Sequence, residues 1–290
     1  MSDDNDEPDE ERAERPRDSK VDEARRILME RFFPAEGRGV YYGRQLEVAL
    51  EGEFFHWITK KALNELAAGR RINLAVEQTG THQAHFYWPL RHRYPRRQIR
   101  ETLALIAEFS SPDFTRAVGV TGEQLIDAGF ARIGFRIRQA KVREVGGLRW
   151  ASSNHDLDRL VERDGVLYGV EIKNQLGYID QTEFGIKLDM CRFFRVRPMF
   201  VARMMPKSYI HRVNRAGGFA LLTGYQHYPL LSDGLAARVR ERLGLPVRIV
   251  RELPDTTLSR FENWHMQVLA HPPVSGQWKV GNEESYRQDR

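Results

Sequence analysis

The chain has 290 residues, of which 41% are hydrophobic and 29% charged, so it has the composition of a globular protein with one or two domains. Its single cysteine, Cys191, excludes an intrachain disulfide and is typical of a reducing compartment. No apolar run approaches the roughly 20 residues of a membrane span, and the acidic N-terminus is unlike a signal peptide. We therefore expect a cytoplasmic protein with no membrane partner.

Charge is distributed unevenly along the chain. Residues 1–24 hold eleven acidic and four basic residues, a net charge of −7, whereas the rest holds 41 basic and 29 acidic residues, a net charge of +12. The first 21 residues offer almost no apolar side chains to bury, so we expect a disordered acidic tail over 1–21. The basic remainder is compatible with a nucleic-acid partner, and ordinary surface charge would explain it equally well.

The segment 22–112 has the pattern of a small helical domain with a hairpin. Apolar residues at helical spacing predict the helices, and two runs of strand composition predict the hairpin. The expected elements are a helix over 21–33, a short strand or turn and a helix over 39–53, a helix over 54–70, strands over 72–79 and 84–90, and a helix over 96–109. This order resembles that of winged helix-turn-helix domains.

The resemblance implies that the helix over 54–70 enters a DNA groove and that the hairpin over 72–90 is the wing. Basic side chains there would bind phosphates. The residues expected to contact DNA are Thr59, Lys60, Lys61, Arg91, Arg93, Arg96 and Arg97. The alternative, a helical domain used for packing or dimerisation, stays open at this stage.

The segment 113–275 has the order of a mixed α/β domain. We expect a linker over 110–114, a helix capped by Thr121 and ending near Gly134, and a polar tail over 276–290. The later elements are expected to be strands over 135–142, 155–163, 166–175, 198–204, 218–223 and 246–250, and helices over 179–196, 208–216, 235–244 and 258–270. The order α-β-β-β-α-β-α-β predicts a mixed sheet flanked by helices.

The second and third of these strands form a hairpin that sets two acids opposite each other. Asp164-Gly165 favours a two-residue turn, so Arg163 should pair with Val166. Counting outward, Asp158 then faces Glu171. Carboxylates opposed in this way, about 5 Å apart at Cβ, repel each other unless a cation lies between them.

Because side chains alternate along a strand, Asp156 and Lys173 should share the face of these two acids. The other face should hold Leu157, Val161, Tyr168, Val170 and Ile172. Oxygen ligands suit Mg²⁺, which can activate a bound water, and a lysine beside it can orient or deprotonate that water. The alternative is a solvated ion pair between Asp156 and Lys173, worth under about 1 kcal/mol, with the acids splayed into water.

The spacing of Asp158, twelve further residues and then Glu171-Ile172-Lys173 resembles the PD-(D/E)XK nuclease superfamily. The resemblance covers about residues 118–225 and implies a restriction-endonuclease-like fold, a mixed sheet with an αβββαβ core. The stretch TGEQLIDAGFARIGF over 121–135 is similar to the superfamily's first core helix, which often carries a metal-site glutamate, here Glu123.

The resemblance also implies roles for individual residues. The implied metal ligands are Asp158, Glu171, Glu123 and the backbone carbonyl of Ile172, with Mg²⁺ as the cofactor and Mn²⁺ as a substitute. The implied catalytic residues are Asp158, Glu171, Lys173, Glu123 and Gln175. Lys187 and Asp189, on the helix that follows, are expected to be solvated.

These expectations amount to a metal-dependent endonuclease that hydrolyses phosphodiester bonds of duplex or branched DNA, in restriction, defence or repair. Such nucleases often work as homodimers when they cut both strands. The alternatives are a non-cleaving winged-helix DNA-binding protein that uses the nuclease fold as a scaffold, and an RNA-directed nuclease.

Overall fold

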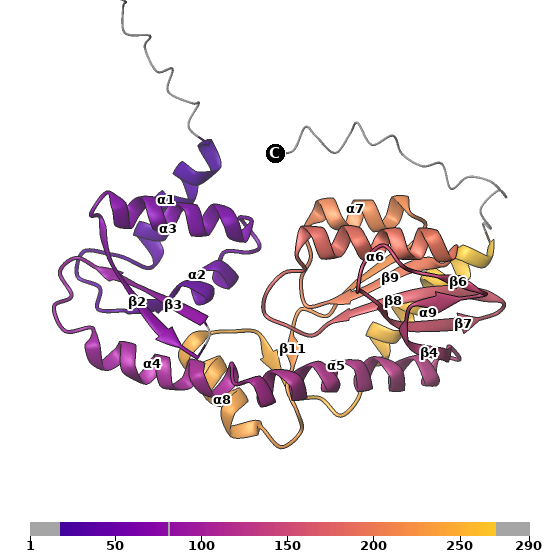
Figure 1. The fold of residues 1–290 in the computed structure, drawn as a ribbon. Helices are drawn as coiled ribbons and strands as arrows, with labels where there is room; N and C mark the ends of the chain where they lie inside the picture. The colour runs from indigo at the N-terminus through magenta and orange to yellow at the C-terminus, as the bar shows by residue number, and fades with distance from the viewer. Residues whose placement is uncertain (1–17, 81, 271–290) are drawn as a thin grey trace, which may run out of the picture. The chain divides into compact units, whose positions relative to one another are not determined.

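The computed structural model describes residues 18–80 and 82–270, which form two compact units (Figure 1). Unit 1 ends at Ala107 and includes Leu243–Leu245, and unit 2 comprises Glu108–Arg242 and the chain from Pro246 onward. The boundary lies about five residues before the predicted one. A helix begins at Ser19, within the range expected for the acidic tail, while residues 1–17 and the tail predicted over 276–290 lie outside the described residues.

Unit 1 has the predicted order of helices and hairpin strands. Its elements are α1 (Ser19–Arg31), β1 (Tyr41–Tyr42), α2 (Gly43–Ala49), α3 (His56–Ala68), β2 (Ile72–Thr79), β3 (His82–Pro89) and most of α4 (Arg96–Phe109). The three strands form an antiparallel sheet in the order β1-β3-β2. Apolar side chains of α1, α2 and α3, such as Leu28, Leu46 and Leu63, form its core.

Unit 2 is a mixed α/β unit. Its elements are α5 (Pro112–Arg132), β4 (Arg136–Val142), β5 (Glu144–Val145), β6 (Leu148–Arg149), β7 (Leu157–Arg163), β8 (Val166–Lys173), α6 (Gln181–Phe194), β9 (Arg197–Ala202), α7 (Lys207–Arg215), β10 (Phe219–Leu222), β11 (Gln226–His227), α8 (Asp233–Leu243), β12 (Val247–Arg248) and α9 (Asp255–Ala270). The α-β-β-β-α-β-α-β order that the sequence predicts is present, with the short β5–β6 hairpin added.

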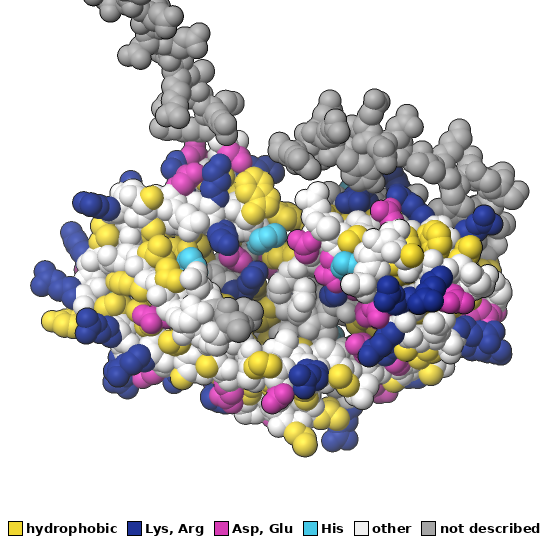
Figure 2. Space-filling model, viewed as in Figure 1, with side chains coloured by type: hydrophobic (Ala, Val, Ile, Leu, Met, Phe, Trp, Pro, Cys, Tyr) yellow, Lys and Arg dark blue, Asp and Glu magenta, His cyan; other side chains and the backbone are white. Residues whose placement is uncertain are grey.

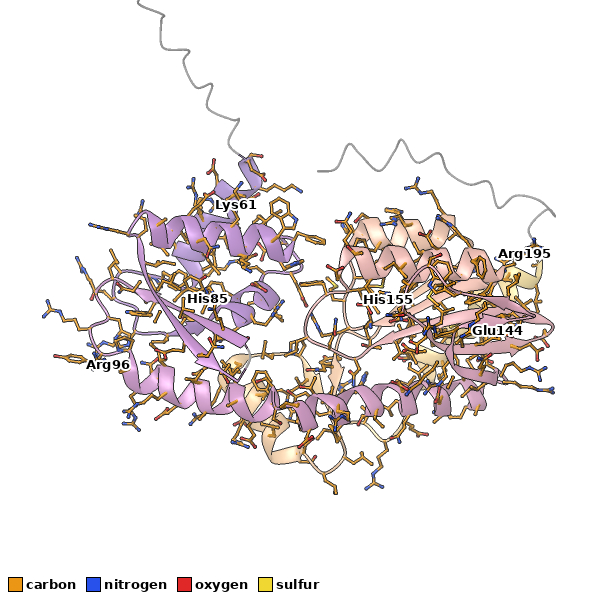
Figure 3. All side chains as sticks on the ribbon, in the orientation of Figure 1. Lys61, His85, Arg96, Glu144, His155 and Arg195 are labelled. Carbon is orange, nitrogen blue, oxygen red and sulfur yellow. The ribbon has the colours of Figure 1, made fainter. Side chains whose placement is uncertain are left out.

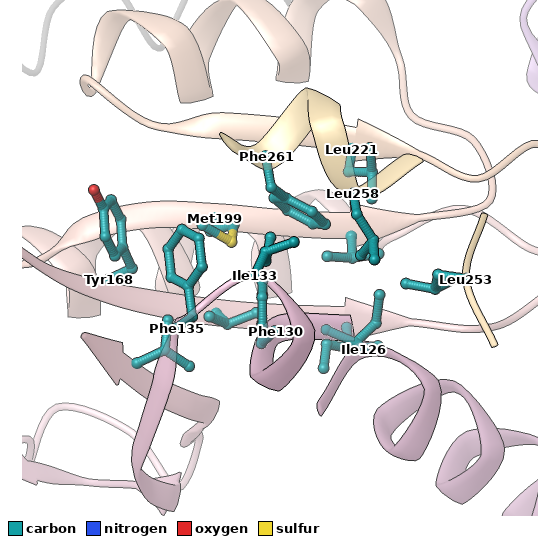
Figure 4. Close-up of a cluster of buried hydrophobic side chains, with 14 of the residues drawn as sticks. Ile126, Phe130, Ile133, Phe135, Tyr168, Met199, Leu221, Leu253, Leu258 and Phe261 are labelled. Carbon is teal, nitrogen blue, oxygen red and sulfur yellow. The ribbon is translucent and has the colours of Figure 1, made fainter. Parts of the chain in front are cut away.

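The sheet of unit 2 has five strands in the order β10-β9-β8-β7-β4. The pairs β10–β9 and β9–β8 are parallel, and β8–β7 and β7–β4 are antiparallel, so the sheet is mixed as predicted. Helices α5 and α9 cover one face through a cluster that includes Ile126, Phe130 and Phe261 (Figure 4), and α6 and α7 cover the other. Strand β8 lies at the centre of the sheet.

The expected linker over 110–114 is wrong, because α5 begins at Pro112. Ser111 caps it by accepting a hydrogen bond from the Phe114 amide at 3.4 Å, and Pro112 fits the first helical turn, where its missing N–H costs nothing. Thr121 is therefore no cap. It lies inside the helix and donates its hydroxyl to the Ala117 carbonyl at 2.8 Å.

The predicted hairpin register is confirmed, with Arg163 paired to Val166 and Leu160 to Gly169. The ladder ends at Arg159 and Val170. Beyond it Leu157 lies on the α6 side of the sheet, not on the predicted face. It fills the space above Gly169, where an added Cβ would approach Leu157 Cδ1 to 2.8 Å.

Within 18–80 and 82–270, every helix is too short or too polar to cross a membrane.

Candidate active site

The candidate site lies where β8 ends beside the first turns of α6. Alternation along β8 directs Glu171 and Lys173 toward α6, and Asp158 comes from the beginning of β7. Helix α6 contributes Glu183 and Lys187, which lie one above the other at i and i+4. Its N-cap Asp180 accepts hydrogen bonds from the amides of Thr182 and Glu183, which fixes where the helix begins.

Glu171 is the most buried group of the site, with 1% of its surface exposed. Lys173 Nζ lies 2.9 Å from Oε1 and Lys187 Nζ lies 2.6 Å from Oε2. These contacts are ion pairs without good hydrogen-bond alignment. Both carboxylate oxygens therefore face positive charge, and neither is satisfied as a buried hydrogen-bond acceptor normally is.

Lys173 is held between two carboxylates. Its ammonium lies 2.9 Å from Glu171 and 2.7 Å from Glu183. Burial lowers the pKa of Lys173, but the two carboxylates raise it more, so it stays above its ordinary value. Lys173 is therefore positively charged at neutral pH. It can donate hydrogen bonds and stabilise negative charge, but it is not a base in this arrangement.

Asp158 has the opposite character. Burial and, to a lesser extent, the nearby charge of Glu171 raise the pKa of its carboxyl to about 7, although the Ile172 amide and the two lysines lower it. Its Oδ2 accepts a hydrogen bond from the Ile172 amide at 2.6 Å. In a continuous strand ladder this amide would donate to a backbone carbonyl, so the Asp158 side chain takes the place of that carbonyl. The charge of Glu171 acts on Asp158, but the two residues lie beyond the end of the strand ladder, so the predicted cross-strand pair of acids is not part of it.

The prediction that Lys187 is solvated is wrong. It is 4% exposed, pairs with Glu171 and donates a hydrogen bond to the backbone carbonyl of Asp156. Its position could have been found from the sequence, because it shares the buried stripe of α6 with Phe184, Leu188 and Cys191. Asp189 is exposed, as expected.

The cross-strand ion pair weighed as an alternative is also absent from this arrangement. Asp156 precedes β7, and its backbone oxygen meets Lys187, whereas the ammonium of Lys173 goes to Glu171 and Glu183. Glu171 is buried and the half-buried Asp158 accepts a hydrogen bond from the Ile172 amide, so a purely solvated charge pattern does not describe this site.

Two of the implied catalytic residues do not join the cluster. The Glu123 carboxylate binds Arg159 Nη2 at 2.8 Å, and Arg159 also binds Asp127 at 2.9 Å. This salt bridge was not foreseen because Arg159 is an ordinary strand residue in sequence. Gln175 is exposed, and its amide donates to the Tyr178 carbonyl at 3.2 Å.

The donor set fits a hard divalent cation in part. Asp158 and Glu171 supply two carboxylates whose mutual repulsion a cation would relieve, and the Glu171 oxygens lack aligned donors. Glu123 does not complete a three-acid set, and no group of three His, Cys, Asp or Glu side chains suited to a metal is found over 18–80 and 82–270. A cation would therefore be held by Asp158 and Glu171.

The residues expected to contact DNA divide into two groups. Thr59 is fully buried in the α3 stripe that packs into the unit 1 core, so its expected groove contact is wrong. The others are exposed: Lys60, Lys61, Arg91, Arg93, Arg96 and Arg97. Figure 3 labels Lys61 on α3 and Arg96 at the beginning of α4.

Basic side chains do not gather into one patch on the face that Figure 2 shows. Arg91 pairs with Glu36 at 2.6 Å and Arg97 with Glu101 at 2.9 Å. Figure 2 shows Lys and Arg side chains spread over the visible face of the protein, interspersed with acidic ones. A nucleic-acid surface must therefore be argued from particular residues.

Comparison with known proteins adds no relative, since no family model and no curated protein matches the chain. The geometry of Asp158, Glu171 and their lysines is thus the basis for proposing a function.

Proposed function

We propose that the protein is a metal-dependent DNA endonuclease, in which unit 2 hydrolyses a phosphodiester bond and unit 1 binds DNA as a winged-helix domain. The observation that carries the proposal is the pairing of the half-buried Asp158 with the buried Glu171, with Lys173 beside them. Burying charged groups is costly, and apolar residues of similar volume would often stabilise a fold as well or better. Charges kept in such a position therefore support a chemical role.

In this proposal the residues of the chain divide the work. A bound Mg²⁺, for which Mn²⁺ could substitute, supplies a nucleophilic water and neutralises phosphate charge. Asp158 and Glu171 would hold it, and the carbonyl of Ile172 is a further candidate ligand. Lys173, charged and held at the mouth of the site by Glu183, orients the attacking water and donates to the phosphoryl oxygens as negative charge develops.

The element order of unit 1 supports the DNA-binding half of the proposal. Its hairpin follows α3 directly, and Lys60 and Lys61 are exposed on α3. These side chains would bind the phosphate backbone, which positions DNA without reading its sequence. A homodimer would allow both DNA strands to be cut. Such an activity would serve in restriction, defence or repair.

A non-cleaving DNA-binding protein is the second candidate, and one observation favours it. Both oxygens of Glu171 already face ammonium groups, so the cluster is largely self-neutralising and can brace β8 against α6. Under this alternative unit 2 is a scaffold, and only unit 1 touches DNA.

Replacing Asp158 with Ala separates the two candidates. Under the endonuclease proposal the Asp158→Ala protein binds duplex DNA in a gel-shift assay but no longer cuts it in Mg²⁺. Asp189→Ala is the matched control, because Asp189 is an exposed acid of α6 that pairs with Arg192 at 2.9 Å. Cutting by Asp158→Ala at the rate of the unsubstituted protein would disprove the assignment, and the same assay with RNA of matched sequence tests the RNA-directed alternative.

A further inference from the structure

Lys187 is a buried charged residue of unit 2 that contacts the candidate site but has no role in the proposed function. It lies inside α6, with 4% of its surface exposed. Desolvating an ammonium group costs several kcal/mol unless it is paired with good geometry. Its retention among Phe184, Leu188 and Cys191 therefore calls for a reason beyond filling the core.

Its two contacts join separate parts of the site. Lys187 Nζ lies 2.6 Å from Glu171 Oε2 and donates to the backbone carbonyl of Asp156. Asp156 stands two residues before Asp158, directly before β7 begins and beyond the end of its ladder with β8. One ammonium group thus ties the segment that carries Asp158 to the side chain of Glu171.

The two oxygens of Glu171 are not equivalent. Oε2 faces Lys187, whose side chain is 5% exposed, whereas Oε1 faces Lys173, whose side chain is 22% exposed and shared with Glu183. Lys173 can leave Glu171 and still pair with Glu183. Lys187 cannot leave in the same way, because it lies among the buried side chains of α6. Both oxygens are buried, and Oε1 is the one that a displacement of Lys173 would open to a ligand.

We propose that Lys187 is a positioning residue for the Asp158–Glu171 pair: by holding Glu171 Oε2 and the Asp156 carbonyl together, it leaves Oε1 and the Asp158 carboxyl in place for a divalent cation. This inference rests on the proposed function, since it assigns the cation to the same site. Lys187 touches neither the water nor the phosphate and acts through the two carboxylates.

Charge repulsion alone predicts the opposite change in cation affinity when Lys187 is replaced. Removing a positive charge beside a cation site should tighten cation binding if charge alone matters. Removing a positioning group should weaken it, on the order of tenfold or more, as is typical of groups that orient metal ligands. The sign of the change therefore separates the two explanations.

The test is a titration of the full chain with Mn²⁺ alone, followed by electron paramagnetic resonance of the free ion. The proteins compared are the unsubstituted chain, Lys187→Met, Lys187→Arg and the control Lys207→Met, which alters an exposed residue of α7. We expect about tenfold weaker binding for Lys187→Met, weaker binding for Lys187→Arg because its larger planar head displaces Glu171, and no change for the control.

Each outcome bears on one claim. If the unsubstituted chain binds no Mn²⁺, the metal-dependent function fails, whereas binding that is unchanged or tighter in Lys187→Met overturns the positioning role alone. Should Lys187→Met not fold, Lys187→Arg decides: affinity equal to that of the unsubstituted chain would show that charge suffices. In plasmid cleavage, a folded Lys187 variant should lower kcat while KM for DNA stays within about twofold, since phosphate contacts elsewhere set DNA affinity.

Discussion

Replacing Glu171 with Gln should destabilise unit 2 far more than replacing Glu183 with Gln. The first change leaves the 4% exposed Lys187 without its carboxylate, and breaking a buried pair in this way costs about 3–5 kcal/mol. Glu183 is different, because its side chain is 29% exposed and Lys173 keeps Glu171 when Glu183 is lost. Its loss should cost about 1 kcal/mol or less.

Urea denaturation at pH 7 with EDTA measures the loss of unfolding free energy for both variants. A double-mutant cycle then tests whether the loss in Glu171→Gln comes from the unpaired Lys187. Because Glu171→Gln combined with Lys187→Met removes both buried charges, the double variant should recover about 2–4 kcal/mol relative to the sum of the single changes. Additive effects of the two single changes, or equal losses for Glu171→Gln and Glu183→Gln, would refute the reasoning that Lys187 depends on Glu171.

Three further predictions concern Tyr168, Asp158 and the contrast between Thr59 and Lys61. Tyr168→Phe removes the hydroxyl that lies 2.6 Å from His265 Nδ1 and should cost about 1–2 kcal/mol in urea unfolding; a loss below about 0.5 kcal/mol would contradict it. The pKa of Asp158 is about 7 folded against 3.8 unfolded, so its ionisation costs stability as pH rises from about 4 to 7, up to about 4 kcal/mol. Asp158→Asn should therefore gain stability over the unsubstituted protein at pH 8 but not at pH 4, in EDTA; an equal difference at both pH values would argue against the shift. Thr59 has a buried hydroxyl without a hydrogen-bond partner among the described residues, so Thr59→Val should keep or raise the melting temperature and leave DNA affinity unchanged. Lys61→Ala, in contrast, should weaken DNA binding and flatten the dependence of DNA affinity on salt concentration. Loss of DNA affinity in Thr59→Val would restore Thr59 as a contact.

The elements that the sequence predicts best are those set by local patterns. The Asp164-Gly165 turn and the alternation of β7 and β8 determine the hairpin register, because a shift by one residue would turn Val170 toward the charged face. The strand β2 and the helix α4 were likewise predicted with the bounds that the structure has. In each case neighbouring residues carry enough information.

What the sequence could not show depends on partners distant in the chain. Glu123 is drawn to Arg159, and Lys187 to Glu171 and Asp156, and neither choice follows from spacing within one element. The place of Leu157 depends on the space that Gly169 leaves on the neighbouring strand. The beginning of α5 is a different case, because Ser111-Pro112 is a local helix-start signal, and the expected linker over 110–114 overlooks it.

Cleavage of supercoiled plasmid by the purified protein, in Mg²⁺ or in EDTA and beside the Lys173→Ala variant, tests the central claim most directly. The proposal predicts nicking or linearisation that requires the metal and that Lys173→Ala lacks, because the charged and partly exposed Lys173 would orient water beside Asp158 and Glu171. Equal cutting by Lys173→Ala, or binding of the plasmid with no cutting in Mg²⁺ or Mn²⁺, would contradict it.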